Sequence, residues 1–264
     1  MPAVRRSDLV AEVIHDPDSD EPRRRFAEWG VPRSDPQAEL TQLQLAGRDE
    51  RRRNDLYAAA TYGLKAAALL EQHRQVWDSD VRAITTLPSV FYRGFVEHAF
   101  VDAPTFLSRA PELYAIAPIR AITFIDAGDH VDAIAASPHL ARLVSVVFGR
   151  KSRPIGDAGL RTFLASPYLG KLRLLSAPFN DIGGNGMEAL CAAHLPSLIY
   201  ANLGNNRVDS PQEECAFDNI SGLVNNNSIS LPKLGRELEA KYGPQPWLHA
   251  PSLLSPYPPN EGDV

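Results

Sequence analysis

Cysteine and long apolar runs are both scarce in this sequence. It has only two cysteines in 264 residues, Cys191 and Cys215, which are too few and too far apart for a zinc motif. We therefore interpret both as reduced thiols. No apolar run approaches the roughly 18 residues of a membrane-spanning helix, and residues 1–8 lead into no apolar signal region. These absences favour a cytoplasmic protein without a membrane partner.

Basic charge is also lacking overall, because the formal net charge is −5. Two arginine runs, at residues 23–25 and 51–53, depart from this balance, but acidic residues flank each of them. We expect both runs to lie on solvated helix faces with local ion pairs. Nucleic-acid binding through the two runs is the alternative, and it would require one continuous basic face. The charge pattern favours a protein with no nucleic-acid partner.

Phosphate loops, nucleophile elbows and paired-histidine metal motifs are absent as well. We therefore predict no catalytic residue, no cofactor and no metal site. The glycine-rich stretch at residues 183–186 precedes an expected helix, so its amides could meet an anion, but a tight bend explains the same glycines. His98, with Glu97 beside it, and His130 resemble acid–base groups. Solvent-exposed histidines with ordinary neighbours are the simpler interpretation.

The sequence does contain a phrase that recurs at a fixed distance. Residues 172–182 read LRLLSAPFNDI, and residues 198–208, which lie 26 positions later, read LIYANLGNNRV. Leucine or alanine occupies the same spaced positions in both copies, and Asn180 of the first corresponds to Asn206 of the second. Similarity at a fixed period of this length indicates one supersecondary unit stacked on copies of itself.

Each copy has the pattern of a short strand, a bend and a returning helix. Alternate residues of the strand point into the stack, and the asparagine stands at the bend. Its amide can donate to and accept from backbone groups, so we expect stacked asparagines to form a ladder. An apolar helical pattern follows at residues 187–195, and weaker earlier copies cover residues 143–164 and 119–135.

These units resemble leucine-rich repeats, and most closely the ribonuclease-inhibitor type with one strand and one α-helix per repeat. The resemblance covers roughly residues 118–210. It implies an α/β fold in the form of a short leucine-rich-repeat solenoid. An ordinary α/β domain with chance leucine periodicity is the alternative.

The sequence before the repeats is similar to the bacterial repeat-companion domain. The similarity rests on residues 9–29 and on the segment at residues 38–44. It implies a small all-helical N-terminal module and a broad role in binding, with no catalytic residues. Residues 30–32, Gly-Val-Pro, depart from the family pattern, so the helix should end early there.

The chain is therefore predicted to divide into successive segments. They are a disordered tail at 1–8, the helical module at 9–75, a linking and capping segment at 76–117, leucine-rich repeats at 118–210, a C-terminal cap at 211–243 and a proline-rich tail at 244–264. Two short helices separated by the acidic turn at 16–20 should open the helical module. Further helices should occupy about residues 37–74, with Gly47 near a break.

We predict a noncatalytic interaction protein that binds another protein through the strand face of the repeats. Tyr200 is the expected anchor, because an aromatic side chain brings a large contact area at little entropic cost. The simpler explanation is that Leu174 and Tyr200 only cover neighbouring repeats. An enzyme with a pocket between the helical module and the repeats is the alternative. The positions expected to point outward from the strand face are Ala121 and the seven predicted binding residues Thr123, Ser145, Val147, Leu174, Ser176, Tyr200 and Asn202.

Overall fold

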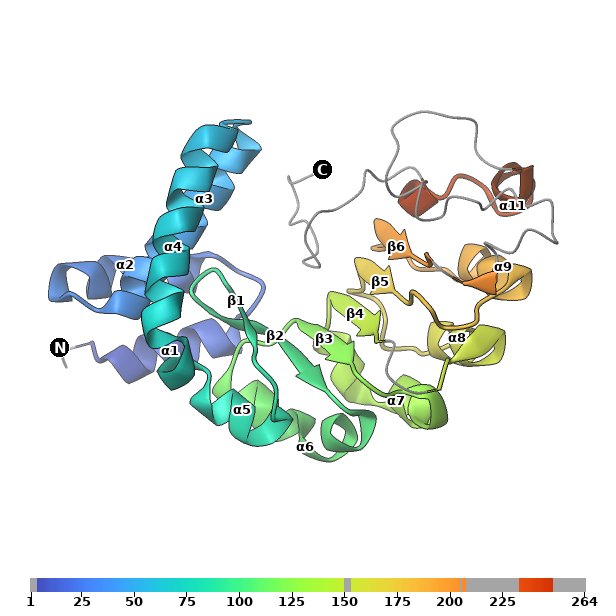
Figure 1. Ribbon diagram of the computed structural model, residues 1–264, viewed down its shortest axis with the longest axis horizontal. Helices are drawn as coiled ribbons and strands as arrows, with labels where there is room; N and C mark the ends of the chain where they lie inside the picture. Colours follow the sequence, from blue (N-terminus) through green and yellow to red (C-terminus); the bar gives the residue numbers. More distant parts are fainter. Residues whose placement is uncertain (1–3, 150–152, 205, 208–232, 249–264) are drawn as a thin grey trace. The chain divides into compact units, whose positions relative to one another are not determined.

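The computed structural model describes residues 4–149, 153–204, 206–207 and 233–248 of the chain. These residues form an α/β protein with one six-stranded, mostly parallel sheet (Figure 1). They divide into two compact units. The first unit holds the described residues up to Phe100 together with Arg109–Arg120, and the second holds Val101–Ser108 and the described residues from Ala121 onward. The predicted α/β class is confirmed.

The strands follow one another across the sheet in the order of the sequence. β1 and β2 are antiparallel, whereas β3 to β6 pair in parallel. Parallel neighbours need a crossover connection, and the helices between these strands supply it. The strands are β1 (Val90–Tyr92), β2 (Phe95–Val101), β3 (Ala121–Phe124), β4 (Ser145–Phe148), β5 (Leu174–Ser176) and β6 (Tyr200–Asn202).

Helices dominate the first unit, and acidic side chains start two of them. Asp35 accepts hydrogen bonds from the backbone nitrogens of Gln37 and Ala38, and Asp55 accepts one from that of Ala58. The helices, with η marking a 3₁₀ helix, are α1 (Arg6–His15), α2 (Glu21–Gly30), η1 (Val31–Arg33), α3 (Pro36–Arg52), α4 (Leu56–Trp77) and α5 (Ser79–Thr85). One apolar cluster of this unit contains Leu9, Val13, Phe26, Ala38 and Phe95.

The predicted helical module agrees with the structure in outline and differs in two places. The acidic turn does separate α1 from α2, and α2 does end early, at Gly30. The disordered tail predicted for residues 1–8 is wrong from Arg6 onward, because α1 begins there; residues 1–3 lie outside the described part. The break expected near Gly47 lies instead just before Asp55, which caps α4.

Gly47 has a packing role inside α3. A Cβ atom at this position would lie 3.1 Å from the Cβ of Tyr62 and 3.5 Å from the backbone oxygen of Ala59, both on α4. The glycine therefore lets α3 and α4 approach each other closely, and it does not interrupt the helix.

A β-hairpin occupies the segment that the sequence suggested as a linker to the repeats. The turn between β1 and β2 consists of Arg93 and Gly94, with φ angles of 48° and 87°. Positive φ at both positions matches the twist of antiparallel strands. Two glutamines of α3 hold the tip: Gln44 Oε1 accepts from the nitrogen of Gly94 at 2.7 Å, and Gln37 Nε2 donates to its oxygen at 3.1 Å.

Strands and helices alternate in the second unit, beginning with β3. α7, α8 and α9 pack on one another in succession, as β3 to β6 do (Figure 1). Strand and helix positions of the predicted repeats are thus confirmed within the described residues. α6 (Ala103–Ile116) contributes residues to both units. The other helices are η2 (Gly128–His130), α7 (Val131–Ala136), η3 (Pro138–Arg142), α8 (Gly156–Leu164), α9 (Gly184–Ala192), α11 (Lys233–Tyr242) and η5 (Pro246–Leu248).

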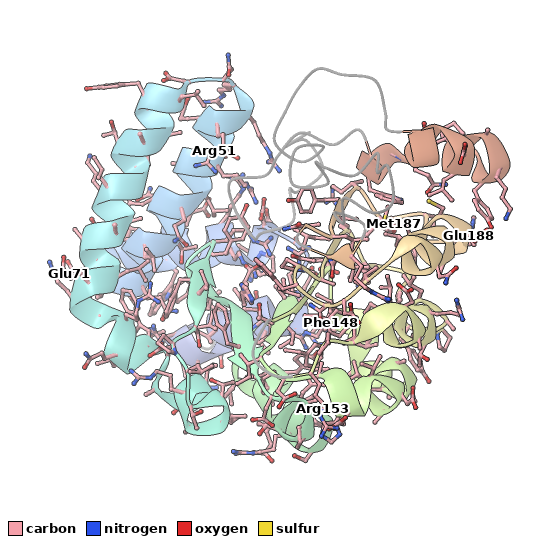
Figure 2. All side chains as sticks on the ribbon, turned by 45° about the vertical axis from the view of Figure 1, so that its right-hand side comes forward. Arg51, Glu71, Phe148, Arg153, Met187 and Glu188 are labelled. Carbon is pink, nitrogen blue, oxygen red and sulfur yellow. The ribbon has the colours of Figure 1, made fainter. Side chains whose placement is uncertain are left out.

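The core of the second unit lies between the parallel strands and these helices. Phe148, labelled in Figure 2, stacks on Phe124 with ring centres 5.9 Å apart and meets Phe163 edge-on at 5.0 Å. The side chains paired along the inner row are all buried and come from successive strands. They are Ile122, Val146, Leu175 and Ala201.

The C-terminal elements pack against the last described strand and helix. α11 lies on α9, which carries Glu188 (Figure 2). Lys241 Nζ and Tyr242 Oη bind Glu188 Oε1. η5 packs against β6, and its Trp247 is buried. A helix in the predicted cap is confirmed from Lys233 onward, while the predicted cap residues 211–232 lie outside the described part. Residues 246–248, which belong to the predicted proline-rich tail, form a 3₁₀ helix that packs against β6.

Candidate functional site

Asn206 connects two successive strand–helix units through its side-chain amide. Its Oδ1 accepts hydrogen bonds from the backbone nitrogens of Asn180 at 2.7 Å and Ile182 at 3.1 Å. Its Nδ2 donates to the backbone oxygens of Ala177 at 2.9 Å and Leu203 at 2.6 Å. The residue is buried, so these bonds satisfy backbone groups that water does not reach. The predicted asparagine ladder is confirmed at this junction.

Asn180 makes the corresponding connection one unit earlier. Its Nδ2 donates to the backbone oxygen of Phe148 at 3.1 Å, and its Oδ1 accepts from the nitrogen of Ile155 at 3.3 Å. The two asparagines therefore perform the same task in consecutive units. Each one fastens its own bend to the bend before it, which fixes the spacing between neighbouring strands.

The glycine-rich amino end of α9 binds a carboxylate of the same chain, that of Asp157. Asp157 Oδ1 accepts from the backbone nitrogens of Gly183 at 2.6 Å and Gly186 at 3.1 Å. Its Oδ2 lies 3.4 Å from Nη2 of Arg207. A Cβ at Gly186 would lie within 2.6 Å of Asp157 Oδ1, so only glycine allows this approach. The carboxylate occupies the place considered for an external anion.

The predicted binding residues line up in two rows across β3 to β6. Ala121, Ser145, Leu174 and Tyr200 are partners in successive strand pairs, and so are Thr123, Val147, Ser176 and Asn202. Residues two apart on a strand point to the same face. The structure therefore brings all seven predicted residues together on the face opposite the inner row of the core.

The two rows differ in their exposure to solvent. Ser145, Leu174 and Tyr200 are 0%, 1% and 6% exposed, so the first row is buried. In the second row, Val147 and Asn202 are half-buried, whereas Thr123 and Ser176 are buried at 8% and 9%.

Tyr200 is therefore not an exposed anchor, and we correct that expectation. Burial raises the pKa of its hydroxyl. Strand alternation predicts which face a residue joins, but not whether that face is covered, because coverage depends on residues distant in the sequence. The binding role of the two rows stays a prediction.

The histidines singled out in the sequence lie in different surroundings from those expected. His98 is 1% exposed and stacks on Phe100 with ring centres 4.7 Å apart. Burial lowers the pKa of His98 to about 4. Glu97 beside it is also buried, and His130 is half-buried. The expectation that His98 is solvent-exposed was wrong, because β2 lies in the interior of the first unit.

Glu97 is the centre of a buried ionic network in the first unit. Its carboxylate accepts hydrogen bonds from Nη2 of Arg23 at 2.7 Å and from Nε and Nη2 of Arg93 at 2.9 Å and 2.8 Å. Arg120 Nη1 lies 3.7 Å from the same group. Three arginines thus surround this buried carboxylate.

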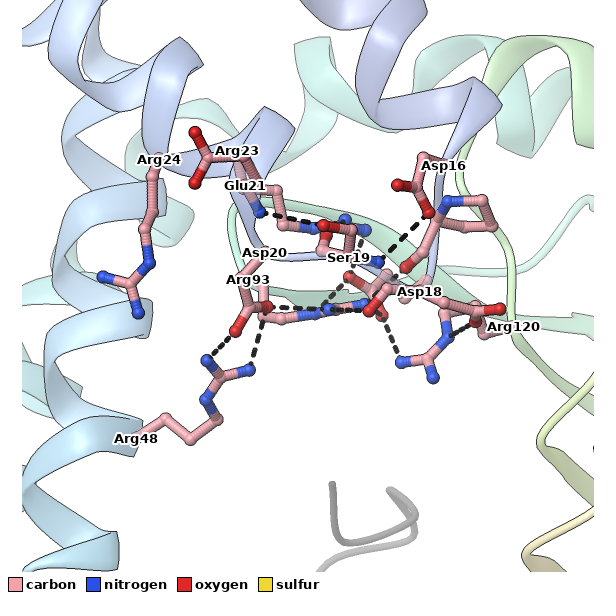
Figure 3. A network of polar contacts seen from close by, with 12 residues as sticks. Asp16, Asp18, Ser19, Asp20, Glu21, Arg23, Arg24, Arg48, Arg93 and Arg120 are labelled. Carbon is pink, nitrogen blue, oxygen red and sulfur yellow. Dashed lines mark hydrogen bonds and ion pairs between the residues drawn. The ribbon is translucent and has the colours of Figure 1, made fainter. Parts of the chain in front are cut away.

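The same arginines hold the acidic turn between α1 and α2 (Figure 3). Arg93 donates to the backbone oxygens of Pro17 at 2.8 Å and Asp18 at 3.2 Å, and to Oδ1 of Asp20 at 2.9 Å. Arg120 Nε donates to Oδ1 of Asp18 at 2.8 Å, and Arg48 of α3 binds both carboxylate oxygens of Asp20. The network therefore ties the turn to α3 and to the β1–β2 hairpin.

The pKa values in the network follow from burial and from these bonds. Burial favours the neutral form of Asp20, but the hydrogen bonds from Arg48 and Arg93 outweigh it, so the pKa of Asp20 is lowered. Burial lowers the pKa of Arg23 to about 10, and the nearby Arg93 and Arg120 act in the same direction. Both residues stay charged at neutral pH. We therefore interpret the network as a structural device.

The arginine runs of the sequence are only partly the solvated faces that were expected. Surface pairs do join Arg24 to Asp49, Arg25 to Glu12 and Arg53 to Glu50. Arg23 is the exception, since it is fully buried and pairs with Glu97, 74 positions away. The nearby acidic residues suggested local pairing for Arg23, and no local signal pointed to Glu97.

Cys191 is a free thiol whose pKa burial raises to about 12, while Cys215 lies outside the described residues. Among the residues that the structure describes, no cluster of histidine, cysteine, aspartate or glutamate could hold a metal ion. In the same part of the chain, no helix has the length and apolar character needed to cross a membrane.

No protein-family model, curated protein or solved structure matches the chain.

Proposed function

We propose that the chain is a short leucine-rich-repeat solenoid that binds another protein without catalysis. The asparagine contacts support the repeat interpretation, because Asn180 and Asn206 make equivalent bonds in consecutive units. The succession of parallel strands and packed helices supports it as well. The helical first unit would then precede the repeats as a companion module.

The row Thr123–Val147–Ser176–Asn202 is the surface that we assign to the partner. It carries the proposal because strand register places one residue from each of four consecutive strands side by side. A partner that lies across the strands would contact every unit at once. Val147 and Asn202 retain exposed surface, and the row has no charged side chain, so a polar but uncharged surface fits it best.

A glutamate at position 147 tests this assignment. Tagged wild-type and Val147→Glu proteins would be purified from the cells that naturally produce the chain, and the retained proteins would be identified by mass spectrometry. We expect the variant to lose the partner, because the new carboxylate lies unpaired in the contact. Ala133→Glu, on the exposed side of α7, is the matched control and should retain it. Equal retention by Val147→Glu, with an unchanged circular dichroism spectrum, would contradict the proposal.

A further inference from the structure

α4 is a long surface helix with an unusually apolar exposed side. Leu56, Tyr57 and Leu64 are 63%, 86% and 75% exposed, and Ala60, Ala67 and Ala68 are exposed between and beyond them. From Leu56 to Gln72 the only charged residues are Lys65 and Glu71. A helix that is apolar on every side is normally covered on every side. We call this exposed set of residues the α4 stripe.

The rest of the first unit covers only the opposite side of α4. Ala59 and Ala66 are the buried residues of the helix, and they face α3, on which α4 mainly packs. Glu71, labelled in Figure 2, points away from α3. The stripe is thus on the free side of the α3–α4 pair.

Spacing along the stripe matches the contact positions of a two-helix pair. Tyr57, Ala60, Leu64, Ala67 and Glu71 follow one another at alternating intervals of three and four residues. This is the repeat by which one helix faces another along its whole length. Large and small side chains alternate in it, which allows two such stripes to interlock at a short interhelical distance.

We propose that the α4 stripe binds the same stripe of a second copy of this chain, antiparallel about a two-fold axis level with Tyr62. Residues equally far before and after this position then lie opposite each other in the two copies. Leu64 meets Ala60 of the second copy, Tyr57 meets its Ala67, and Leu56 meets its Ala68. Every large side chain therefore faces a small one. An isologous contact of this kind closes on itself as a dimer.

Charge supports the same register. In it, Glu71 lies near the α3–α4 turn of the second copy, where Arg53, the C-cap of α3, pairs with Glu50 and has a side chain that is 71% exposed. The Glu71–Arg53 pair occurs twice because of the symmetry. Each such pair places opposite charges together at one end of an otherwise apolar interface. Like charges do not meet in this alignment.

The area is sufficient for a weak, specific dimer. From the exposed fractions, the stripe offers on the order of 500 Å² per copy, or roughly 1,000 Å² in total, which is at the lower limit of specific interfaces. We therefore expect dissociation in the micromolar range. A second copy fits the stripe because its own stripe supplies the complementary sizes, and Arg53 near the start of its α4 supplies the complementary charge.

Sedimentation and light scattering test the proposal with the full chain. Wild-type protein should shift from monomer to dimer mass as its concentration rises to about 200 µM. Leu64→Lys should raise the dimer dissociation constant about tenfold or more, because it places two unpaired ammonium groups in the interface. Val76→Lys adds the same charge to an equally exposed site of α4 outside the stripe, so its mass should match that of wild type.

Disulfide trapping tests the register. In a Cys215→Ser background, a mixture of Tyr57→Cys and Ala67→Cys chains should form a crosslinked heterodimer, whereas neither variant alone should crosslink. Wild-type protein that stays monomeric at about 200 µM, or an undiminished dimer in Leu64→Lys, would overturn the proposal. Crosslinking of Tyr57→Cys to itself would overturn the proposed alignment. Both lysine variants lie on exposed positions, so circular dichroism should show the wild-type fold in each.

Discussion

The side-chain oxygen of Asn206 lies 2.7 Å from the backbone nitrogen of Asn180, the equivalent residue of the preceding unit. Removing this oxygen in Asn206→Ala leaves the buried backbone nitrogens of Asn180 and Ile182 without it. Each unsatisfied buried group costs about 1–3 kcal/mol, so we expect the free energy of unfolding to fall by about 2–4 kcal/mol. Urea denaturation monitored by circular dichroism measures this change.

Asn185→Ala is the matched control for that experiment, because Asn185 is an exposed residue of α9. Its free energy of unfolding should stay within about 0.5 kcal/mol of wild type. Equal stability of the two variants would show that the Asn206 ladder bonds contribute nothing.

Glu97→Gln should destabilise the first unit strongly. The substitution keeps the shape of the side chain but leaves Arg23 and Arg93 buried beside a neutral amide. Breaking a buried pair in this way costs about 3–5 kcal/mol, measured as a shift of the urea midpoint. Glu112→Gln removes an exposed partner of Arg109, so its urea midpoint should stay close to that of wild type. A similar loss in both variants would refute a central role for Glu97.

His98 should make stability depend on pH below neutrality. Burial lowers its pKa to about 4 in the folded protein, whereas an unfolded histidine has a pKa of about 6.5. Between these values the unfolded chain binds the extra proton, so stability falls as the pH drops from about 6.5 to 4, by up to about 3 kcal/mol. His98→Phe, which preserves the ring packing with Phe100, should reduce this slope. If the unfolding free energy of His98→Phe had the same pH profile as that of wild type, His98 would not be the cause of the pH dependence.

Tyr200→Ala should destabilise the second unit. The side chain is 6% exposed, so its truncation leaves a cavity beside β6 and should cost about 3–5 kcal/mol of unfolding free energy. Tyr200→Phe keeps the ring and should cost less than about 1.5 kcal/mol. Melting curves of the two variants distinguish them. A melting temperature of Tyr200→Ala equal to that of wild type would return this residue to the list of surface anchors.

Local periodicity was enough to predict the positions of the parallel strands and of the helices between them in the second unit. The spacing of Ile122, Val146 and Leu175 marks strands because each of these residues fills the same place in its own unit. The asparagine ladder was predictable for the same reason: Asn180 and Asn206 stand at equivalent bends. Repetition supplies several independent copies of one signal, and this makes such elements readable from the sequence.

The first unit was harder to predict because its polar contacts are distant in the sequence. Arg23 lies beside acidic residues and was assigned to the surface, yet its partner Glu97 is 74 positions away. The hairpin was missed although Arg93-Gly94 is a turn signal, because residues 76–117 were interpreted as a linking and capping segment. The candidate binding rows were placed on the correct strands, but their burial depends on packing that no local pattern encodes.

The hydrogen bonds between α3 and the tip of the β1–β2 hairpin have a consequence for folding kinetics. Gly94 is bound by Gln44 and Gln37, which precede it by 50 and 57 positions, and a larger residue at Gly94 would collide with Thr41. A long loop must therefore close before this strand pair finds its alignment, so the hairpin should form late and exchange its Gly94 amide hydrogen only when α3 detaches. Deuterium uptake at that single amide would then report the opening of the whole helical module.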